Sequence, residues 1–243
     1  MTAWYTAFVW LADPTNWSGP DGIPTRVGEH LLYTLITLII ASAIAIPVGL
    51  AIGHSGKGRG LAIQVSGVLR ALPTLGLLVL LALWLGLGFT PPLIVMVLLA
   101  LPPLLAGAYA GVDSVDKETV DAAKSIGMTG RQVLLKVELP LALPIIIGGI
   151  RSGCLQVIAT WTVAAYLPLG GLGRYIYDGL AVQNYAEMLG ASILVIVLAL
   201  IADGAFAVVQ RLVVPRGVVV GRASDVRVRR SKRLPASQSS AAG

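Results

Sequence analysis

Residues 121–140 carry the polar pattern with the clearest chemical meaning in this sequence. They run from Asp121-Ala-Ala-Lys-Ser-Ile-Gly127 to Val137-Glu-Leu-Pro140, between two stretches too apolar for a water-soluble fold. Residues 71–112 contain no Asp, Glu, Lys or Arg, and residues 141–173 contain only Arg151. A polar segment between two such stretches predicts a docking surface for a partner in the cytosol.

Capping signals divide this segment into two short helices. Asp116 is a suitable N-cap for a helix that begins at Lys117, and Gly127 is the residue type that tolerates a left-handed helix end. Thr129-x-x-Gln132 has the spacing of a capping box, which predicts a second helix over residues 130–138. We expect this helix to stop before Pro140, because proline disfavours helical geometry in the preceding residue. The result is a rigid elbow over residues 116–140.

The composition requires a membrane for the rest of the chain. Of the 243 residues, 56% are hydrophobic and 12% are charged, whereas soluble domains carry about 25% charged residues. The apolar runs do not alternate as barrel strands would, so the fold class is all-α, a polytopic helical bundle. The net charge of +6 by itself would also suit a protein that binds nucleic acid. In a membrane protein, an excess of Lys and Arg more often marks the loops that face the cytosol.

Apolar runs long enough to cross the bilayer predict about five transmembrane helices. Their expected ranges are 31–52, 63–87, 92–111, 144–167 and 188–210. Lys and Arg gather in the loops after the first and third runs and beyond Gln210. By the positive-inside rule this places the N-terminus outside and the C-terminus in the cytoplasm. Residues 1–28 are expected to form an extracytoplasmic, interfacial segment, and residues 211–243 a basic, disordered cytoplasmic tail.

The elbow resembles the cytoplasmic signature of the permease subunits of ABC importers. That signature reads Glu-Ala-Ala, three residues, Gly, nine residues, Ile-x-Leu-Pro, and here Asp replaces Glu and Val replaces Ile. The resemblance covers residues 29–210, the expected transmembrane domain. Arg70-Ala-Leu-Pro73-Thr74-Leu-Gly and Gly170-Gly-Leu-Gly173 are similar to the osmoprotectant subfamily. The resemblance assigns contact with an ATPase to Asp121, Ala122, Ala123, Gly127, Val137, Leu139 and Pro140.

This resemblance implies import of glycine betaine, carnitine or choline across the bacterial inner membrane. It implies several partners: cytosolic ATPase subunits that bind ATP and Mg²⁺, a second permease subunit, an extracytoplasmic solute-binding protein and membrane lipid. The chain has no Gly-x-x-x-x-Gly-Lys-Ser/Thr loop, so it is expected to bind no cofactor and to be no enzyme. Methionine-type permeases share a five-span plan, which leaves import of methionine or another amino acid as an alternative.

Sparse polar and aromatic side chains within the apolar runs are candidates for the translocation pathway. They are Thr74, Thr160, Thr162 and Tyr166, although helix packing is the commoner role for such residues. We expect Arg70 to extend to the inner interface and Arg151 to pair with a carboxylate or with helix carbonyls. His30 and His54 have no companions at metal-ligand spacing, so they are expected to be loop residues and no metal site is predicted.

The sequence also bears on two other classes of membrane protein. An intramembrane protease would need a His-Glu-x-x-His cluster or two intramembrane Asp residues, and the sequence has neither. An ATP-independent carrier or channel is the other alternative. Five spans with no detectable internal repeat argue against a self-contained carrier.

Overall fold

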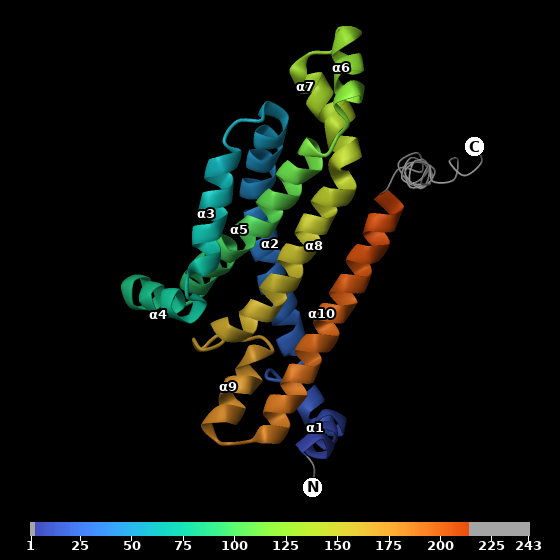
Figure 1. Ribbon diagram of the computed structural model, residues 1–243. Helices are drawn as coiled ribbons and strands as arrows, with labels where there is room; N and C mark the ends of the chain where they lie inside the picture. Colours follow the sequence, from blue (N-terminus) through green and yellow to red (C-terminus); the bar gives the residue numbers. More distant parts are fainter. Residues whose placement is uncertain (1–2, 214–243) are drawn as a thin grey trace, which may run out of the picture.

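The structure, a computed structural model, describes residues 3–213 of the chain. These residues form an elongated bundle of long helices with a small pair of helices standing clear at one end (Figure 1). In chain order the α-helices are α1 (Ala3–Ala12), α2 (Ile23–Ser55), α3 (Arg59–Ala71), α4 (Thr74–Leu85), α5 (Thr90–Asp113), α6 (Lys117–Ser125), α7 (Gly130–Val133), α8 (Leu139–Ala164), α9 (Gly173–Ala181) and α10 (Tyr185–Val213). A 3₁₀ turn over Pro14–Trp17 follows α1, and a π-helical turn over Leu134–Glu138 joins α7 to α8.

Four helical segments within residues 3–213 are long and apolar enough to cross a membrane. They are Ile23–Ser55, Thr90–Asp113, Gly130–Ala164 and Tyr185–Val213, and the bent pair formed by α3 and α4 brings the number to as many as five. The all-α membrane bundle predicted from the sequence is therefore confirmed. The helices extend beyond the predicted ranges because they continue into polar residues at their ends. α2, for example, begins at Ile23 rather than Leu31, with Pro24 in its first turn.

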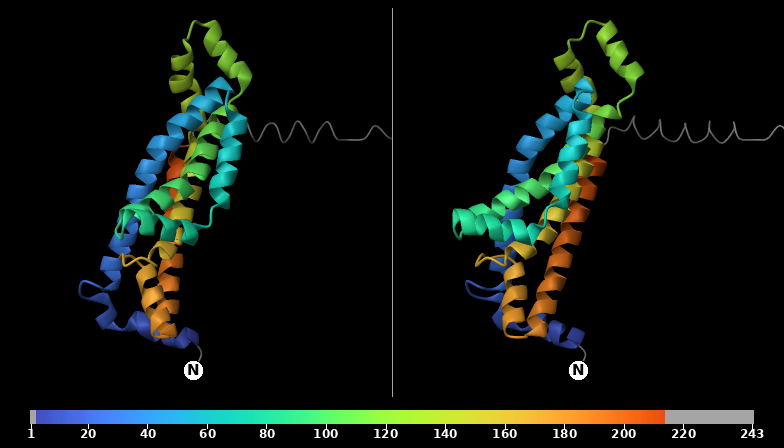
Figure 2. Two further views of the ribbon diagram at one scale, coloured as in Figure 1. Left: turned by 90° about the vertical axis from the view of Figure 1, so that its left-hand side faces the viewer. Right: turned by 60° about the vertical axis from the view of Figure 1, so that its left-hand side comes forward.

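The second predicted span is not one straight helix. α3 and α4 meet at an angle of 82°, and α4 runs across the long helices rather than along them (Figure 2). Leu72 has an extended backbone, with φ −66° and ψ 129°, because Pro73 disfavours helical geometry in the residue before it. The prediction of a continuous helix over residues 63–87 was wrong, since hydropathy alone does not register this break.

The core lies where α2, α5 and α8 pack together through small residues. A Cβ on Gly49 of α2 would lie 2.6 Å from the Cβ of Ala108 on α5, and a Cβ on Gly107 of α5 would lie 2.6 Å from the Cα of Gly149 on α8. Small residues let membrane helices approach closely and gain dispersion contacts. α10 packs against α8, α9 and α1 at the side of this core.

The N-terminal residues form a helix at the end of the molecule opposite to α6 and α7 (Figure 1). Trp4, Tyr5 and Phe8 of α1 are exposed, whereas Trp10 packs edge-to-face on Tyr175 of α9. The exposed aromatic side chains suit the headgroup region that was predicted for residues 1–28. Most of the predicted tail, from residue 214 onward, lies outside the described residues.

Candidate functional site

The first helix of the elbow begins and ends as its capping residues predict. The Asp116 carboxylate accepts a hydrogen bond from the backbone N–H of Glu118 at 3.2 Å. At the other end Gly127 has φ +89°, in the left-handed region that favours glycine. The N–H of Met128 donates to the carbonyl of Ala123 at 3.2 Å, which is the long bond of a Schellman motif.

The second helix of the elbow begins with the predicted capping box. The backbone N–H of Thr129 donates to Oε1 of Gln132 at 2.8 Å, and the N–H of Gln132 donates to Oγ1 of Thr129 at 3.4 Å. These reciprocal bonds satisfy two N–H groups that would otherwise lack partners at a helix start. Only Met128 separates Gly127 from Thr129, so the angle between the two helices is closely constrained.

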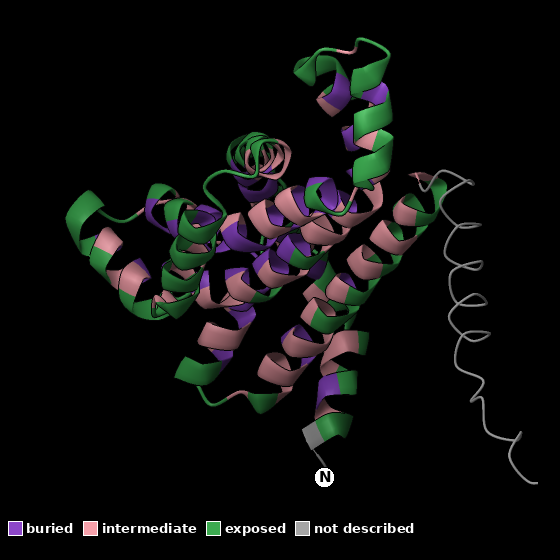
Figure 3. Ribbon diagram, turned by 45° about the horizontal axis from the view of Figure 1, so that its top comes forward, coloured by how far each residue is buried: buried purple, intermediate pink, exposed green. Residues whose placement is uncertain are grey.

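The elbow presents an exposed apolar tip. Ala122 is exposed, and Ile126 is 81% exposed at the end of α6, whereas Ala123 is only 7% exposed. Figure 3 shows that most of α6 and α7 is exposed, in contrast to the buried centre of the bundle. An exposed isoleucine beside an exposed alanine on a rigid element suits a protein partner. The two alanines therefore differ in role: Ala122 lies on the outer surface, and Ala123 packs inside the elbow.

The second helix does not stop before Pro140, so that prediction was wrong. The helix passes through the π-helical turn and continues as α8, so that Gly130–Ala164 is one helical segment. In the π turn the N–H of Leu139 donates to the carbonyl of Leu134, five residues earlier. This wider turn accommodates a proline whose ring would otherwise clash with the carbonyl four residues before it. Val137, Leu139 and Pro140 thus connect the elbow to α8.

A bond that the sequence did not reveal ties the elbow to α2. Nδ1 of His54, in the last turn of α2, lies 2.6 Å from Oε2 of Glu138. Glu138 is buried, with 5% of its surface exposed, and Nε2 of His54 lies 3.4 Å from the position that a Cβ on Gly130 would occupy. We expected His54 to be a loop residue. No local pattern links two residues 84 positions apart, so only the fold could reveal the pair.

The other histidine ties α2 to α8 nearer the opposite end. Nε2 of His30 lies 2.9 Å from the carbonyl oxygen of Ile158, and the His30 side chain is buried. Nearby, Nε1 of Trp161 donates to Oγ1 of Thr37 at 3.1 Å. Both contacts are therefore structural links between α2 and α8. Within residues 3–213 no group of His, Cys, Asp and Glu could hold a metal ion.

The predicted pathway residues do not gather into one site in the single chain. The hydroxyls of Thr160 and Thr162 donate to carbonyls of their own helix, those of Gln156 and Ala159, both at 2.6 Å. Thr74 is the first residue of α4, on a different element from the other three. Tyr166 is 52% exposed and packs edge-to-face on Tyr177. Their role in translocation stays a prediction.

The expected pairing of Arg151 is present. Its Nε and Nη2 donate to the two carboxylate oxygens of Asp203 on α10, at 2.6 and 2.7 Å. A bidentate guanidinium–carboxylate pair fixes both side chains and joins α8 to α10. Nearer the elbow end of α8, Nε2 of Gln210 donates to the carbonyl of Pro144 at 2.9 Å, which adds a second polar contact between the same helices.

A bundle of apolar helices with a capped polar elbow at one end is the arrangement expected of a membrane permease subunit. Comparison with known proteins identifies its family. Residues 29–216 match the family described as binding-protein-dependent transport system inner membrane component, and the chain belongs to this family. The protein is therefore a multi-pass subunit of an ABC transporter of the inner membrane and not itself an enzyme.

Curated relatives of the chain are permeases for quaternary ammonium solutes. The chain is 35% identical to the glycine betaine/carnitine/choline transport system permease protein OpuCB of Bacillus subtilis (strain 168), over 79% of this chain and 89% of that protein. It is 34% identical to the carnitine transport permease protein OpuCB of Listeria monocytogenes, over 78% of this chain and 87% of that protein.

A solved structure shares the fold. The MetNI methionine ABC transporter in an inward-facing conformation matches with a TM-score of 0.73 and 20% sequence identity, over 84% of this chain and 100% of that chain. At this identity the match supports the arrangement of the helices and does not extend to the transported solute.

Proposed function

We propose that this protein imports osmoprotectants of the glycine betaine, carnitine and choline class as the permease subunit of an ATP-driven complex. The observation that carries the proposal is the identity of 35% to a permease named for these three solutes. A permease named for methionine transport shares only 20% identity. The difference favours quaternary ammonium solutes over methionine.

We infer that a separate ATPase subunit drives the protein through the elbow. The exposed tip formed by Ala122 and Ile126 supplies a contact surface, and the cap bonds on both sides of Gly127 hold its shape. The His54–Glu138 contact and the continuous helix from Gly130 pass a displacement of the elbow to α2 and α8. ATP binding to the partner changes its contact with the elbow, so that this contact is more favourable in one conformation of the bundle than in the other. The equilibrium between the two conformations shifts accordingly.

The proposed orientation places the elbow in the cytoplasm and α1 outside. Lys and Arg near the elbow end support it through the positive-inside rule. The test is labelling of intact cells with a membrane-impermeant maleimide in a Cys154→Ala background, which leaves no other cysteine. We expect the maleimide to react with Ser18→Cys in intact cells, and with Ser125→Cys only after the membrane has been permeabilised. Labelling of Ser125→Cys in intact cells would refute the orientation.

The transport proposal is tested by uptake into vesicles that contain the permease, its ATPase, the second permease subunit and the solute-binding protein. We expect uptake of radiolabelled glycine betaine that requires ATP and is inhibited by vanadate, and no uptake of methionine. Uptake that persists without ATP would identify an ATP-independent carrier or channel. Uptake of methionine alone would assign the chain to an amino acid importer.

The elbow proposal is tested by changing one exposed alanine. Ala122→Arg places a long charged side chain on the outer surface of α6, and we expect loss of ATPase co-purification while the permease still inserts. The matched control is Ala181→Arg, an exposed alanine in α9 at the opposite end of the molecule, which should leave co-purification intact (Figure 1). Equal ATPase recovery with both variants would contradict the proposal.

A further inference from the structure

Arg70 is a charged residue in an otherwise apolar stretch of the chain. It lies in the last turn of α3, immediately before the bend at Leu72 and Pro73. At the other end of α3, Arg59 pairs with Asp113 at 3.5 Å. Arg70 is 11 residues further along, which corresponds to about 16 Å at 1.5 Å per residue. A hydrocarbon core is about 30 Å thick, so Arg70 lies near its middle rather than at the inner interface.

The described part of the chain supplies no counter-charge for this guanidinium. Within residues 3–213 Arg70 makes no hydrogen bond and no ion pair, and its side chain is exposed. Arg151, in contrast, is neutralised by both oxygens of Asp203. An unpaired arginine at the centre of a membrane helix is unfavourable even on insertion scales. Its charge must therefore face water or an anionic group other than the carboxylates of residues 3–213.

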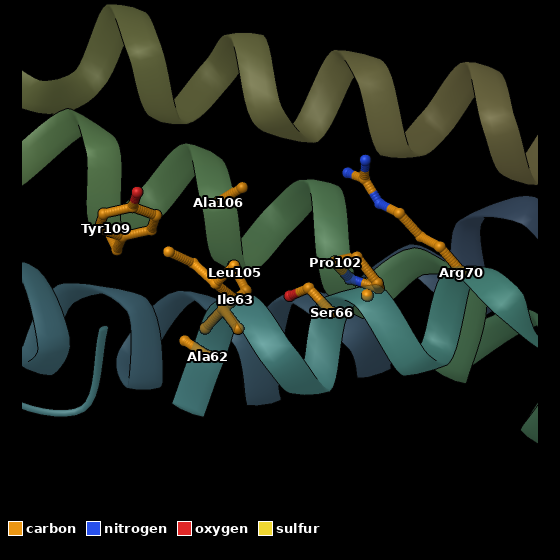
Figure 4. A pocket seen from close by; sticks show the side chains of 9 residues that line it. Ala62, Ile63, Ser66, Arg70, Pro102, Leu105, Ala106 and Tyr109 are labelled. Carbon is orange, nitrogen blue, oxygen red and sulfur yellow. The ribbon is translucent and has the colours of Figure 1, made fainter. Parts of the chain in front are cut away.

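A cavity beside Arg70 has the composition of a site for a small amphiphilic solute. Its volume is about 280 Å³, and it lies between α3 and α5. Figure 4 shows Arg70 and Tyr109 at opposite ends of the cavity, with Ser66 between them. Ile63, Pro102 and Leu105 supply apolar walls. The volume is just below the range for drug-sized ligands, about 300–1,000 Å³, and suits a more compact solute.

We propose that Arg70 binds the carboxylate of a zwitterionic solute during its passage through the membrane. The guanidinium would hold the carboxylate, and the apolar walls would accept methylated ammonium groups, which need no hydrogen-bond acceptors. A solute with a quaternary ammonium group but no carboxylate, such as choline, gains nothing from Arg70 and is repelled by it. This inference rests on the proposed function and adds a basis for discrimination within the permease.

The first test compares two solutes in vesicles whose solute-binding protein delivers both glycine betaine and choline. Arg70→Gln should lower glycine betaine uptake relative to choline uptake by at least about tenfold, because it removes a hydrogen bond between two charged groups. Arg70→Lys keeps the charge but loses the planar fork, so its relative uptake should lie between those of the wild type and Arg70→Gln. An equal decrease for the two solutes would identify Arg70 as a structural or subunit-contact residue and overturn the proposal.

The second test asks whether position 70 faces a water-filled passage, whatever the solute. In the Cys154→Ala background, Arg70→Cys should react with a water-soluble methanethiosulfonate reagent at least tenfold faster than Val68→Cys. Val68 is the matched control, because it is 63% exposed on the same helix but does not line the cavity. Equally slow reaction at both positions would place Arg70 against lipid or protein and refute the site.

The outcomes separate this inference from the proposed function. A wild-type complex that takes up none of glycine betaine, carnitine and choline refutes the proposed function, and with it the solute assignment of Arg70. If the wild-type complex takes up glycine betaine with ATP and the Arg70→Gln variant has the same solute preference, only the proposed role of Arg70 is refuted.

Discussion

The seam between α5 and α8 and the arm formed by α3 and α4 differ in how completely the chain covers them. In the seam, Leu104 is 1% exposed and a Cβ on Gly149 would lie 2.7 Å from the Cα of Gly107. On the arm, Leu83 is 84% exposed and Trp84 is 79% exposed. The seam is closed by its own side chains, whereas the arm leaves large apolar side chains for lipid or another protein to cover.

This contrast separates residues that hold the fold from residues that are free for other contacts. In a membrane, lipid tails are as apolar as leucine, so helix association depends on close packing rather than on removal of apolar surface from water. The seam provides that packing, and the arm contacts the core mainly through α5. Substitutions in the seam should therefore affect stability much more than the same substitutions on the arm.

The largest effect is expected from truncating a leucine in the seam. Leu104→Ala leaves a cavity over Gly153, whose Cβ position lies 2.2 Å from Cδ1 of Leu104, and should lower the free energy of unfolding by about 2–4 kcal/mol. Leu83→Ala on the arm should change it by less than about 0.5 kcal/mol. Thermal unfolding in one detergent measures both. Similar losses would show that the arm is as tightly packed as the seam.

A smaller effect should come from adding a methyl group at the glycine contact. Gly149→Ala places its Cβ 2.7 Å from Gly107 and should destabilise the protein by about 1–3 kcal/mol through overpacking. Gly204→Ala on α10 meets nothing within 4 Å and should be neutral or stabilising, since alanine favours helix. The melting temperatures of the two variants check this. A stabilised Gly149→Ala variant would contradict the close approach of α5 and α8.

The smallest effect is expected at the Arg151–Asp203 pair, whose side chains are about one-third exposed, at 31% and 34%. Asp203→Asn should lower the melting temperature by less than Gly149→Ala does, because the asparagine amide oxygen can still accept a hydrogen bond from the Arg151 guanidinium. Arg151→Gln combined with Asp203→Asn should recover part of that loss. A double-mutant cycle measures the coupling. A cycle with no coupling would show that the pair does not join α8 to α10.

Local signals in the sequence correctly predicted where the two elbow helices begin and where the first of them ends. Asp116, Gly127, Thr129 and Gln132 each act within a few residues of their own position, so their caps appear as expected. The hydropathy pattern likewise indicated the long apolar helices, because about 20 apolar residues are needed wherever a helix crosses a membrane. The family followed from the spacing of the same elbow residues and was confirmed by the match over residues 29–216.

The sequence did not reveal features that depend on how helices meet. The 82° bend at Pro73 and the uninterrupted helix through Pro140 show two prolines with opposite outcomes. Proline limits the preceding residue in both places, but the π turn before Pro140 provides an alternative that no local rule distinguishes. The His54–Glu138 contact joins distant positions. That Arg70 has no partner among residues 3–213 likewise becomes visible only when its neighbours are known.

The two histidine contacts constrain α2 and α8 to move together. His54 binds Glu138 near one end and His30 binds the Ile158 carbonyl near the other, and the 20 residues between Glu138 and Ile158 span about 30 Å. Two contacts that far apart oppose both translation of one helix along the other and a change in the angle between them. A displacement of the elbow would therefore move α2 and α8 as one rigid body. The contacts that change between conformations must then be those of α3, α4 and α10 with this pair.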